Sequence, residues 1–412
     1  MSTLEHDPTG GAPGPRVVVI SASAGAGHDG VTRELADRLR GLGCRVDCAD
    51  LADVMPWGLG RLLRGTYHGL LIRLPWLYDG LFTIGCRFSE AAPATRGLLR
   101  PVRGRMLCSL PPDTGVVVSV YPIVSQVLGP LRREGLLTTP VVTYLTDFAV
   151  HPIWVSPGVD VHCAAHKTSR AQAVALGARD VRVAGRVVSP RCRPPSAADR
   201  RRARDHFGLP TGERLALLVA GSWGVGQVAA AAREIAATGE AVPVTVCGRN
   251  AALYRRMRRA RTGYVFGWVS DMPALMRAVD VLVENAGGLT ALEAMASGLP
   301  VLTYRPIPGH GKANAVAMAE AGVVRLVRRR DELGAALAEL ADGVRAGRQR
   351  SAGLALFESD PAAVIASIAR GADPTTARPT PAPTATATAP TATAPTATAP
   401  TAGAPTATAR QR

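Results

Sequence analysis

Two segments of this chain open in the same way, and this repetition constrains the fold more than any other feature. Each begins with an apolar stretch of strand length, continues through a glycine-rich turn and passes into a stretch of helical character. The first covers residues 16–40 and the second residues 214–237. A strand that enters a helix through a glycine turn is the opening unit of a doubly wound parallel sheet. The sequence therefore predicts two such domains.

Further apolar stretches, separated by helical ones, follow each opening, as expected for parallel sheets covered by helices on both faces. They span residues 45–49, 116–120, 141–145 and 161–164 in the first half, and 242–247, 264–266, 281–284 and 301–304 in the second. Prolines in the interval 187–198 indicate a linker. The predicted fold class is α/β, with two Rossmann-like doubly wound domains facing across a cleft, where ligands bind in such sheets.

The two ends of the chain lie outside both predicted domains. Residues 1–15 are polar and rich in Gly and Pro, and residues 371–412 consist largely of Pro, Thr and Ala. Neither stretch offers an apolar face to offset the entropy of ordering, so both are expected to be disordered. The N-terminal domain is accordingly predicted over residues 16–190 and the C-terminal domain over residues 191–370.

Composition narrows the classes of partner. The formal net charge is +16, which admits anionic membranes, phosphorylated ligands or nucleic acid. No zinc-finger, RRM or homeodomain pattern accompanies the arginines, so nucleic acid is not expected. The seven cysteines are scattered without a CxxC pair, which favours a reducing cytoplasm over a disulfide framework. The sequence contains no run of 18 apolar residues, so no membrane-spanning helix is predicted.

The segment Glu-Asn-Ala-Gly-Gly-Leu-Thr-Ala-Leu-Glu, which ends at Glu293, is the most specific candidate ligand site. Gly287 and Gly288 end a strand and open a helix, where backbone amides can approach a phosphate. Thr290 can cap that helix or bind a phosphate oxygen. Glu293 can accept hydrogen bonds from two vicinal hydroxyls, as on a ribose, or can be an ordinary first-turn glutamate favoured by the helix dipole.

Two other loops of the second half carry candidate donor-site residues. The glycine turn with Gly221, Ser222 and Gly224 either cradles a phosphate or is a tight strand–helix turn without a ligand. The loop Pro-Ile-Pro-Gly-His-Gly-Lys-Ala-Asn offers His310 and Asn314 as donors for sugar hydroxyls or phosphate. The alternative is a solvated loop with incidental polarity.

Candidate acid–base residues follow two strands of the first half. His28 ends the first glycine turn and can act as a general base on an acceptor hydroxyl or cap the following helix. After the strand at 141–145, a short segment brings together Asp147, His151 and Trp154. No metal-ligand spacing such as HExxH is present, so no metal is expected.

Residues 57–73 predict an amphipathic helix with leucines on one side and basic side chains on the other. Trp57, Arg61, Arg64 and Arg73 belong to this stretch. Such a helix either packs on its own domain or lies on a surface of anionic lipid.

Six motifs, in this order over residues 16–330, resemble those of the monogalactosyldiacylglycerol synthases and the bacterial diacylglycerol glucosyltransferases, with MurG-type transferases as more distant relatives. They are Ala24–His28, Leu145–Trp154, Cys247–Asn250, Phe266–Met272, Gly287–Glu293 and Pro308–Asn314. The resemblance implies a GT-B fold, a UDP-sugar donor, inversion at the anomeric carbon and no metal. It implies no cofactor either, because the UDP-sugar is a substrate.

The resemblance also implies roles for individual residues. In such enzymes the Gly-Gly…Glu motif holds the ribose, the residues after the 264–266 strand take the uracil, and the second glycine loop takes the diphosphate. Donor binding then involves Gly221, Ser222, Gly224, Arg249, Trp268, Val269, Met272, Gly287, Gly288, Leu289, Thr290, Glu293, His310 and Asn314. Catalysis involves His28, Asp147 and His151, and the acceptor or membrane contacts Gly25, Gly27, Trp57, Arg61, Arg64, Arg73 and Trp154.

Two departures from the family pattern leave the sugar open. The family often has Lys-Pro-Gly-Gly where this chain has Asn285-Ala-Gly-Gly, and Gln-Glu where this chain has His310-Gly311. The second departure lies where the protein would contact the hydroxyls of the donor sugar, so the sequence does not distinguish among galactose, glucose and other hexoses.

The resulting hypothesis is a transferase that moves a hexose from a UDP-sugar to diacylglycerol and makes a glycolipid. We expect a cytoplasmic protein, peripheral on the inner face of the plasma membrane, whose partners are UDP-hexose, the lipid acceptor and the anionic membrane surface. The alternatives are a transferase for another hydrophobic or peptidoglycan-lipid acceptor and a UDP-sugar epimerase. A non-catalytic nucleotide-sugar-binding module is disfavoured by the presence of His28, Asp147 and Glu293.

Overall fold

The first half of the chain folds around a six-stranded sheet whose neighbouring strands are all parallel, in the order β2-β1-β3-β4-β5-β6. The computed structural model describes residues 14–22, 26–55, 93–221, 226–341 and 343–371, and the statements below refer to these. The strands are β1 (Arg16–Ser21), β2 (Arg45–Asp50), β3 (Thr114–Ser119), β4 (Val141–Tyr144), β5 (Val161–Ala164) and β6 (Val181–Val183). The helices are α1 (Ala26–Gly41), α2 (Leu51–Val54), α5 (Pro93–Ser109), α6 (Pro122–Arg133), η2 (Pro152–Trp154) and α7 (Lys167–Ala175).

Alternate residues of the central strands supply two cores, one on each face of this sheet. Val17 and Val19 of β1 pack with Leu35 of α1, whereas Val18 and Ile20 pack against α5 and α6. Continuous apolar strands of this kind are typical of parallel sheets that are buried on both faces. The glycine turn after β1 therefore lies at the carboxyl edge of the sheet, where α1 begins.

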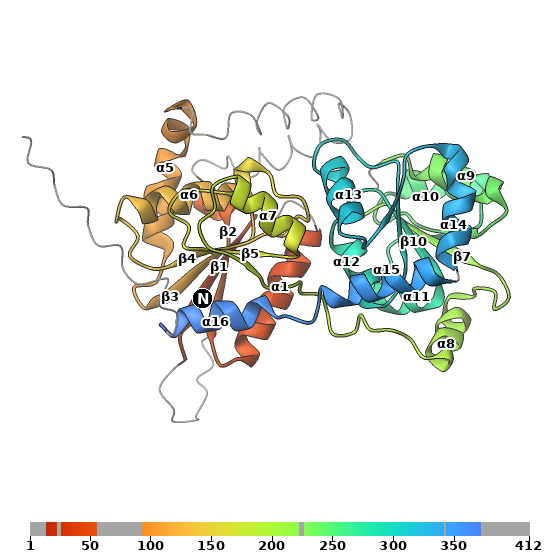
Figure 1. The fold of residues 1–412 in the computed structure, drawn as a ribbon, viewed down its shortest axis with the longest axis horizontal. Helices are drawn as coiled ribbons and strands as arrows, with labels where there is room; N and C mark the ends of the chain where they lie inside the picture. The colour runs from red at the N-terminus through yellow and green to blue at the C-terminus, as the bar shows by residue number, and fades with distance from the viewer. Residues whose placement is uncertain (1–13, 23–25, 56–92, 222–225, 342, 372–412) are drawn as a thin grey trace, which may run out of the picture. The chain divides into compact units, whose positions relative to one another are not determined.

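The second half is also built on a sheet covered by helices (Figure 1). Its strand order is β12-β11-β10-β7-β8-β9, with parallel pairing throughout. The strands are β7 (Leu215–Val219), β8 (Val242–Val246), β9 (Tyr264–Phe266), β10 (Val281–Glu284), β11 (Val301–Tyr304) and β12 (Arg325–Val327). The helices are α8 (Ala197–Phe207), α9 (Val228–Thr238), α10 (Ala251–Ala260), α11 (Met272–Ala278), α12 (Leu289–Ala296), α13 (His310–Glu320), η3 (Arg330–Glu332), α14 (Leu333–Ala341), α15 (Val344–Ala355) and α16 (Pro361–Ala369). The predicted α/β class with two doubly wound sheets is confirmed.

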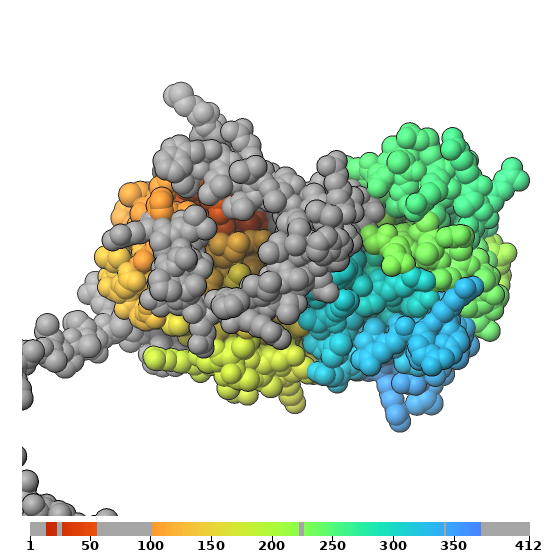
Figure 2. Space-filling model, turned by 90° about the horizontal axis from the view of Figure 1, so that it is seen from above, coloured from red at the N-terminus to blue at the C-terminus, as the bar shows by residue number. Residues whose placement is uncertain are grey.

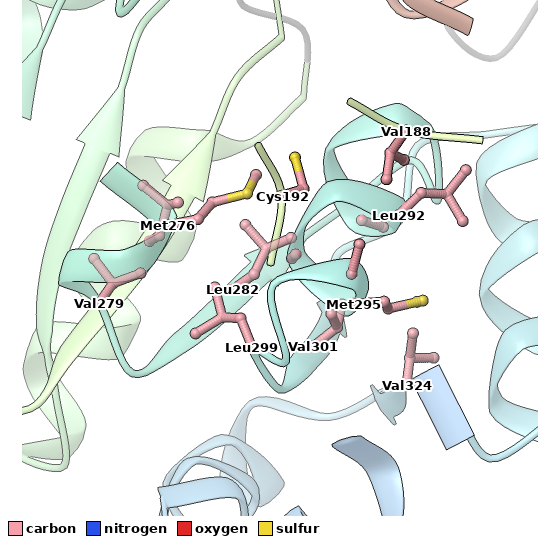
Figure 3. Close-up of a cluster of buried hydrophobic side chains, with 14 of the residues drawn as sticks. Val188, Cys192, Met276, Val279, Leu282, Leu292, Met295, Leu299, Val301 and Val324 are labelled. Atoms are coloured by element: carbon pink, nitrogen blue, oxygen red, sulfur yellow. The ribbon is translucent and has the colours of Figure 1, made fainter. Parts of the chain in front are cut away.

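The linker predicted over residues 187–198 contributes buried side chains to the hydrophobic core. Val188 and Cys192 are buried in the cluster that also contains Leu282, Leu292 and Met295 of the second sheet and its helix α12 (Figure 3). The chain between the two sheets is therefore fixed by packing at these positions, and its prolines do not leave it as a free tether.

The last described helix returns to the first sheet. Ala362, Ile365 and Ala366 of α16 are buried with β1 and β3, so this helix covers the first sheet although it comes last in the chain. The predicted range of the C-terminal domain, residues 191–370, included it. That assignment is corrected here, because proximity in sequence does not show which sheet a terminal apolar helix will cover. All described residues belong to one compact unit.

Among the described residues, no helix combines the length and the apolar composition that crossing a bilayer would need. The predicted amphipathic helix with Trp57, Arg61, Arg64 and Arg73 lies outside the described residues, as do Gly25, Ser222 and Gly224.

Candidate active site

The loop that follows β4 carries the carboxylate at the centre of the site. The indole Nε1 of Trp154 donates a hydrogen bond to Oδ2 of Asp147 at 3.0 Å. The amide Nδ2 of Asn314 donates to Oδ1 of the same carboxylate at 3.4 Å. Trp154 is 0% exposed. It therefore offers no surface to an acceptor or a membrane, contrary to its predicted role, and instead orients Asp147.

A buried arginine fixes the backbone of this loop. The guanidinium of Arg186 donates to the carbonyl oxygen of Leu145, to that of Thr146 at 2.8 Å and to that of Asp147 at 2.7 Å. Its side chain is 1% exposed, and two aromatic rings lie 5.9 Å from the guanidinium carbon. Sequence reasoning missed Arg186, because no local pattern connects it with a loop about forty residues earlier.

Three histidines lie in the electrostatic field of Asp147. Burial lowers the pKa of His28, His151 and His310 below the usual histidine range, although the carboxylate of Asp147 acts in the opposite direction on each of them. Burial alone would raise the pKa of Asp147, but these histidines and the hydrogen bond from Trp154 together lower it. At neutral pH the site therefore contains an ionised carboxylate and neutral imidazoles. A neutral imidazole is the form that can accept a proton.

His28 lies inside the first turn of α1, which begins at Ala26, so it is not the capping residue of that helix. Its ring makes an edge-to-face contact with the ring of Tyr121, with 5.5 Å between the ring centroids. Its Nδ1 atom is buried and has no hydrogen-bond partner among the described residues. A buried nitrogen without a protein partner is a candidate for direct contact with a substrate.

Helices α1 and α12 approach closely at two glycines. A Cβ atom placed on Gly30 would lie only 2.7 Å from Cδ2 of Leu289, and one on Gly27 would lie 3.6 Å from its Cβ. Leu289, predicted to contact the donor, and Gly27, predicted to contact the acceptor, thus meet one another. The side chain of Leu289 packs against α1, which brings the start of α12 near His28.

The glycine turn after β10 is held by a carboxylate that sequence reasoning did not select. One oxygen of Glu284 accepts hydrogen bonds from the backbone amides of Ala286 and Gly287, and the other accepts one from the hydroxyl of Thr303. Gly287 has a φ of 69°, a conformation that favours glycine. Gly288 is the N-cap of α12, so Thr290 does not cap the helix and its hydroxyl remains a candidate phosphate contact.

Glu293 is the fifth residue of α12 and therefore not a first-turn glutamate. Burial raises the pKa of its carboxyl to about 7. Among the described residues we find no hydrogen bond or ion pair to its side chain. A partly buried carboxylate without a protein partner costs stability unless a ligand supplies donors. This placement supports the predicted contact with vicinal hydroxyls.

A second group of candidate donor residues surrounds an open pocket after β9. The guanidinium of Arg249 lies 4.5 Å from the centre of the Trp268 ring, and Trp268 is 52% exposed. Val269 also lines this pocket, and Phe207 at the end of α8 forms one wall that the sequence did not predict. Met272 instead packs on the hydrophobic core at the start of α11. The exposed ring and the guanidinium provide a surface on which a planar base can stack.

Gly221 lies two residues beyond the end of β7, has a φ of 67° and is exposed. Over the described ranges, no group of three His, Cys, Asp or Glu side chains is placed to hold a metal ion.

Two known protein families match separate parts of the chain. Residues 104–187 match the family model of monogalactosyldiacylglycerol (MGDG) synthase, and residues 216–343 match that of glycosyl transferases group 1. The chain is similar to the monogalactosyldiacylglycerol synthases and the diacylglycerol glucosyltransferases. The resemblance carried by the six motifs is thereby confirmed.

Two curated relatives illustrate the extent of the similarity. The processive diacylglycerol beta-glucosyltransferase of Bacillus pumilus (strain SAFR-032) is 28% identical over 228 residues, which are 53% of this chain and 58% of that protein. The enzyme of the same name from Bacillus cereus (strain AH187) is 25% identical over 369 residues, 84% of this chain and 91% of that protein. The chain thus spans little more than half the length of the first of these relatives.

Solved glycosyltransferases share the fold. Medicago truncatula UGT71G1, complexed with UDP-glucose, has a TM-score of 0.55 at 14% identity and covers 88% of this chain and 98% of its own. Acinetobacter baumannii MurG has a TM-score of 0.51 at 16% identity and covers 87% of this chain and 99% of its own. The fold is therefore of the GT-B type.

Proposed function

We propose that this protein transfers a hexose, galactose or glucose, from a UDP-sugar to diacylglycerol and forms a glycolipid. The observation that carries the proposal is a paired arrangement in the two halves of the chain. One half presents a buried imidazole in the electrostatic field of an ionised carboxylate, and the other presents a carboxylate to which we find no hydrogen bond or ion pair among the described residues. The match to MGDG synthase and the diacylglycerol glucosyltransferase relatives support the choice of acceptor.

In the proposed donor site, the uracil stacks between Trp268 and Phe207, and the ribose hydroxyls donate to Glu293. The backbone amides at the start of α12 face the diphosphate, where the partial positive charge of a helix N-terminus favours an anion. Thr290 and the turn at Gly221 contribute further donors. No metal and no cofactor are required in this proposal, because backbone amides can offset the phosphate charge.

In the proposed reaction, His28 removes the proton from the acceptor hydroxyl as its oxygen attacks the anomeric carbon. The bond between that carbon and the diphosphate oxygen breaks, and UDP leaves with the bonding electrons. Attack from the face opposite UDP inverts the anomeric configuration. Asp147 stabilises the imidazolium that forms on His28, as a carboxylate does beside a general-base histidine.

The direct test offers radiolabelled UDP-glucose or UDP-galactose to the protein with diacylglycerol vesicles. We expect labelled lipid with one or both donors. Labelled lipid only with a polyprenyl-linked acceptor would replace diacylglycerol in the proposal. Interconversion of the two nucleotide sugars would indicate an epimerase, and labelled free sugar without lipid product would contradict the proposal.

We also propose that the protein docks on the inner face of the plasma membrane through the basic segment with Arg61, Arg64 and Arg73. Each arginine near an anionic surface contributes about 1 kcal/mol. Replacing all three by alanine should release the protein from anionic vesicles at physiological salt, as measured by sedimentation. Deleting residues 379–412, which have no large apolar side chain and only two charged ones, Arg410 and Arg412, should leave binding intact.

Helix α10 offers a charge-matched control for this experiment. Its exposed Arg255, Arg258 and Arg259 form no ion pair among the described residues, and α10 lies in the green stretch of chain visible at the surface in Figure 2. Replacing these three arginines removes the same charge from the second half. If only the α10 variant is released from the vesicles, the docking surface lies in the second half. If only the tail deletion is released, the tail is the anchor.

A further inference from the structure

Asn314, in the second turn of α13, connects that helix with the loop that carries Asp147. The residue is 1% exposed. Its Oδ1 accepts hydrogen bonds from the backbone amides of Phe148 at 3.0 Å and Ala149 at 2.9 Å. Its Nδ2 donates to the carboxylate of Asp147 at 3.4 Å and to the carbonyl oxygen of Ala286 at 3.3 Å.

These four bonds use the whole capacity of the side-chain amide. An amide oxygen accepts two hydrogen bonds and an amide nitrogen donates two. The two backbone N–H groups also identify the oxygen of the side-chain amide. If the amide were flipped, its NH₂ group would face these N–H donors and no hydrogen bond would form. Asn314 therefore has no donor left for a sugar hydroxyl, and its predicted role in reading the donor sugar is corrected.

We propose that Asn314 is a positioning residue that fixes the carboxylate of Asp147 beside His28. The inference deepens the proposed function and rests on it for its kinetic consequences. Trp154 holds one oxygen of that carboxylate and Asn314 holds the other, so the group cannot rotate without losing a bond. Both donors are neutral, so they stabilise the ionised form without cancelling the negative charge that an imidazolium needs.

The same contact makes the site depend on α13. This helix begins with His310, whose protonation would lower the pKa of both Asp147 and His28. Asn314 also packs closely against the turn after β10, because an added Cβ on Gly287 would lie 2.7 Å from Cβ of Asn314. The acid–base group of the first half is thus complete only when α13 packs against the loop after β4.

Two substitutions test this role. Asn314→Asp keeps the acceptor for both backbone amides but replaces the donor to Asp147 by a second carboxylate. Asn314→Ala removes the donor without adding charge. Both changes should raise the pKa of Asp147, and the aspartate should do so by about one unit or more, because adjacent carboxylates titrate as a coupled pair.

The measurement is a carboxyl ¹³C NMR titration of the ligand-free protein, with the Asp147 resonance assigned by its loss in Asp147→Asn. Gln349 provides the matched control, because it is a buried amide whose side chain bonds the N–H and the carbonyl of Val301, both at 2.9 Å. Gln349→Glu and Gln349→Ala should leave the Asp147 titration unchanged. An unchanged titration in both Asn314 variants would overturn the proposal.

Kinetics supply a second readout. The Asn314 variants should lower kcat by about tenfold or more while the affinity for UDP stays within about threefold. A rise in KM for the donor with unchanged kcat would return Asn314 to sugar recognition and reject the positioning role. A shifted titration in a protein that makes no glycolipid would reject the proposed function and retain the placement of Asp147.

Discussion

Helices α1 and α12 each follow a strand of a parallel sheet, yet near their starts they present side chains in opposite electrostatic settings. His28, in α1, lies among other titratable groups, and burial keeps its pKa low enough for a neutral imidazole. Glu293, in α12, has its pKa raised to about 7 by burial alone. His28 thus lies in the field of the carboxylate of Asp147, whereas among the described residues we find no donor to the side chain of Glu293. In the proposed function, the first setting serves proton transfer and the second serves ligand binding.

The largest effect expected from this comparison is on turnover. His28→Ala should lower kcat by ~10²–10⁴ while UDP affinity stays near normal, because general-base catalysis contributes about that factor. Asp147→Asn should also lower kcat, since the imidazolium then lacks its counter-charge. Wild-type activity should fall as pH drops through the depressed pKa of His28, below 6.5, because only the neutral ring accepts a proton. A loss confined to UDP affinity would assign His28 to phosphate binding.

The residues predicted from the sequence are those that mark the ends of strands. Parallel strands place polar groups such as Asp147 and Glu293 at one edge of each sheet, so a strand followed by a glycine turn or a polar run locates them. The family resemblance then assigned their roles. The two-sheet fold was predictable for the same reason, since buried parallel strands leave short apolar runs in the sequence.

The residues that hold the site together were not predictable in this way. Asn314 bonds a backbone amide 166 positions away, and Arg186 bonds a carbonyl 41 positions away, and neither lies in a local pattern that indicates its partner. Glu284 was part of a quoted motif, but its bonds to the turn depend on the rotamer of its side chain. Packing of Leu289 against Gly30 likewise follows from tertiary structure alone.

The comparison also predicts an effect on stability. The carboxyl of Glu293 has a pKa of about 7 in the folded protein against 4.5 as its ordinary value, so the folded state holds the proton more tightly. The free energy of unfolding therefore falls as pH rises from 4.5 to 7. Glu293→Gln removes this loss and should stabilise the ligand-free protein by about 3 kcal/mol above pH 7, but not below pH 4.5. Urea unfolding of both proteins at the two pH values measures it, and equal stability at high pH would mean that Glu293 has a partner.

A smaller effect is expected on ligand affinity. Glu293→Ala should weaken UDP binding by at least ~1.5 kcal/mol, roughly tenfold, because two ribose hydroxyls lose a charged acceptor. The wild-type affinity should also rise with pH through about 7, as the carboxyl ionises. Calorimetric titration with UDP tests both statements. His28→Ala serves as the control, because it should leave UDP affinity near normal. Equal losses of UDP affinity in the two variants would contradict the assignment of donor binding to Glu293 and of catalysis to His28.

The smallest effect concerns metal, for which we expect no change in rate. If the amides at the start of α12 and the turn held by Glu284 face the diphosphate, the charge that leaves with UDP is offset by fixed backbone dipoles. Transfer measured with excess EDTA should then proceed at the untreated rate, and added Mg²⁺ or Mn²⁺ should not increase it. Loss of activity on chelation, with recovery on adding either cation, would place a metal at the diphosphate. The start of α12 would then serve ribose binding through Glu293 but not phosphate binding.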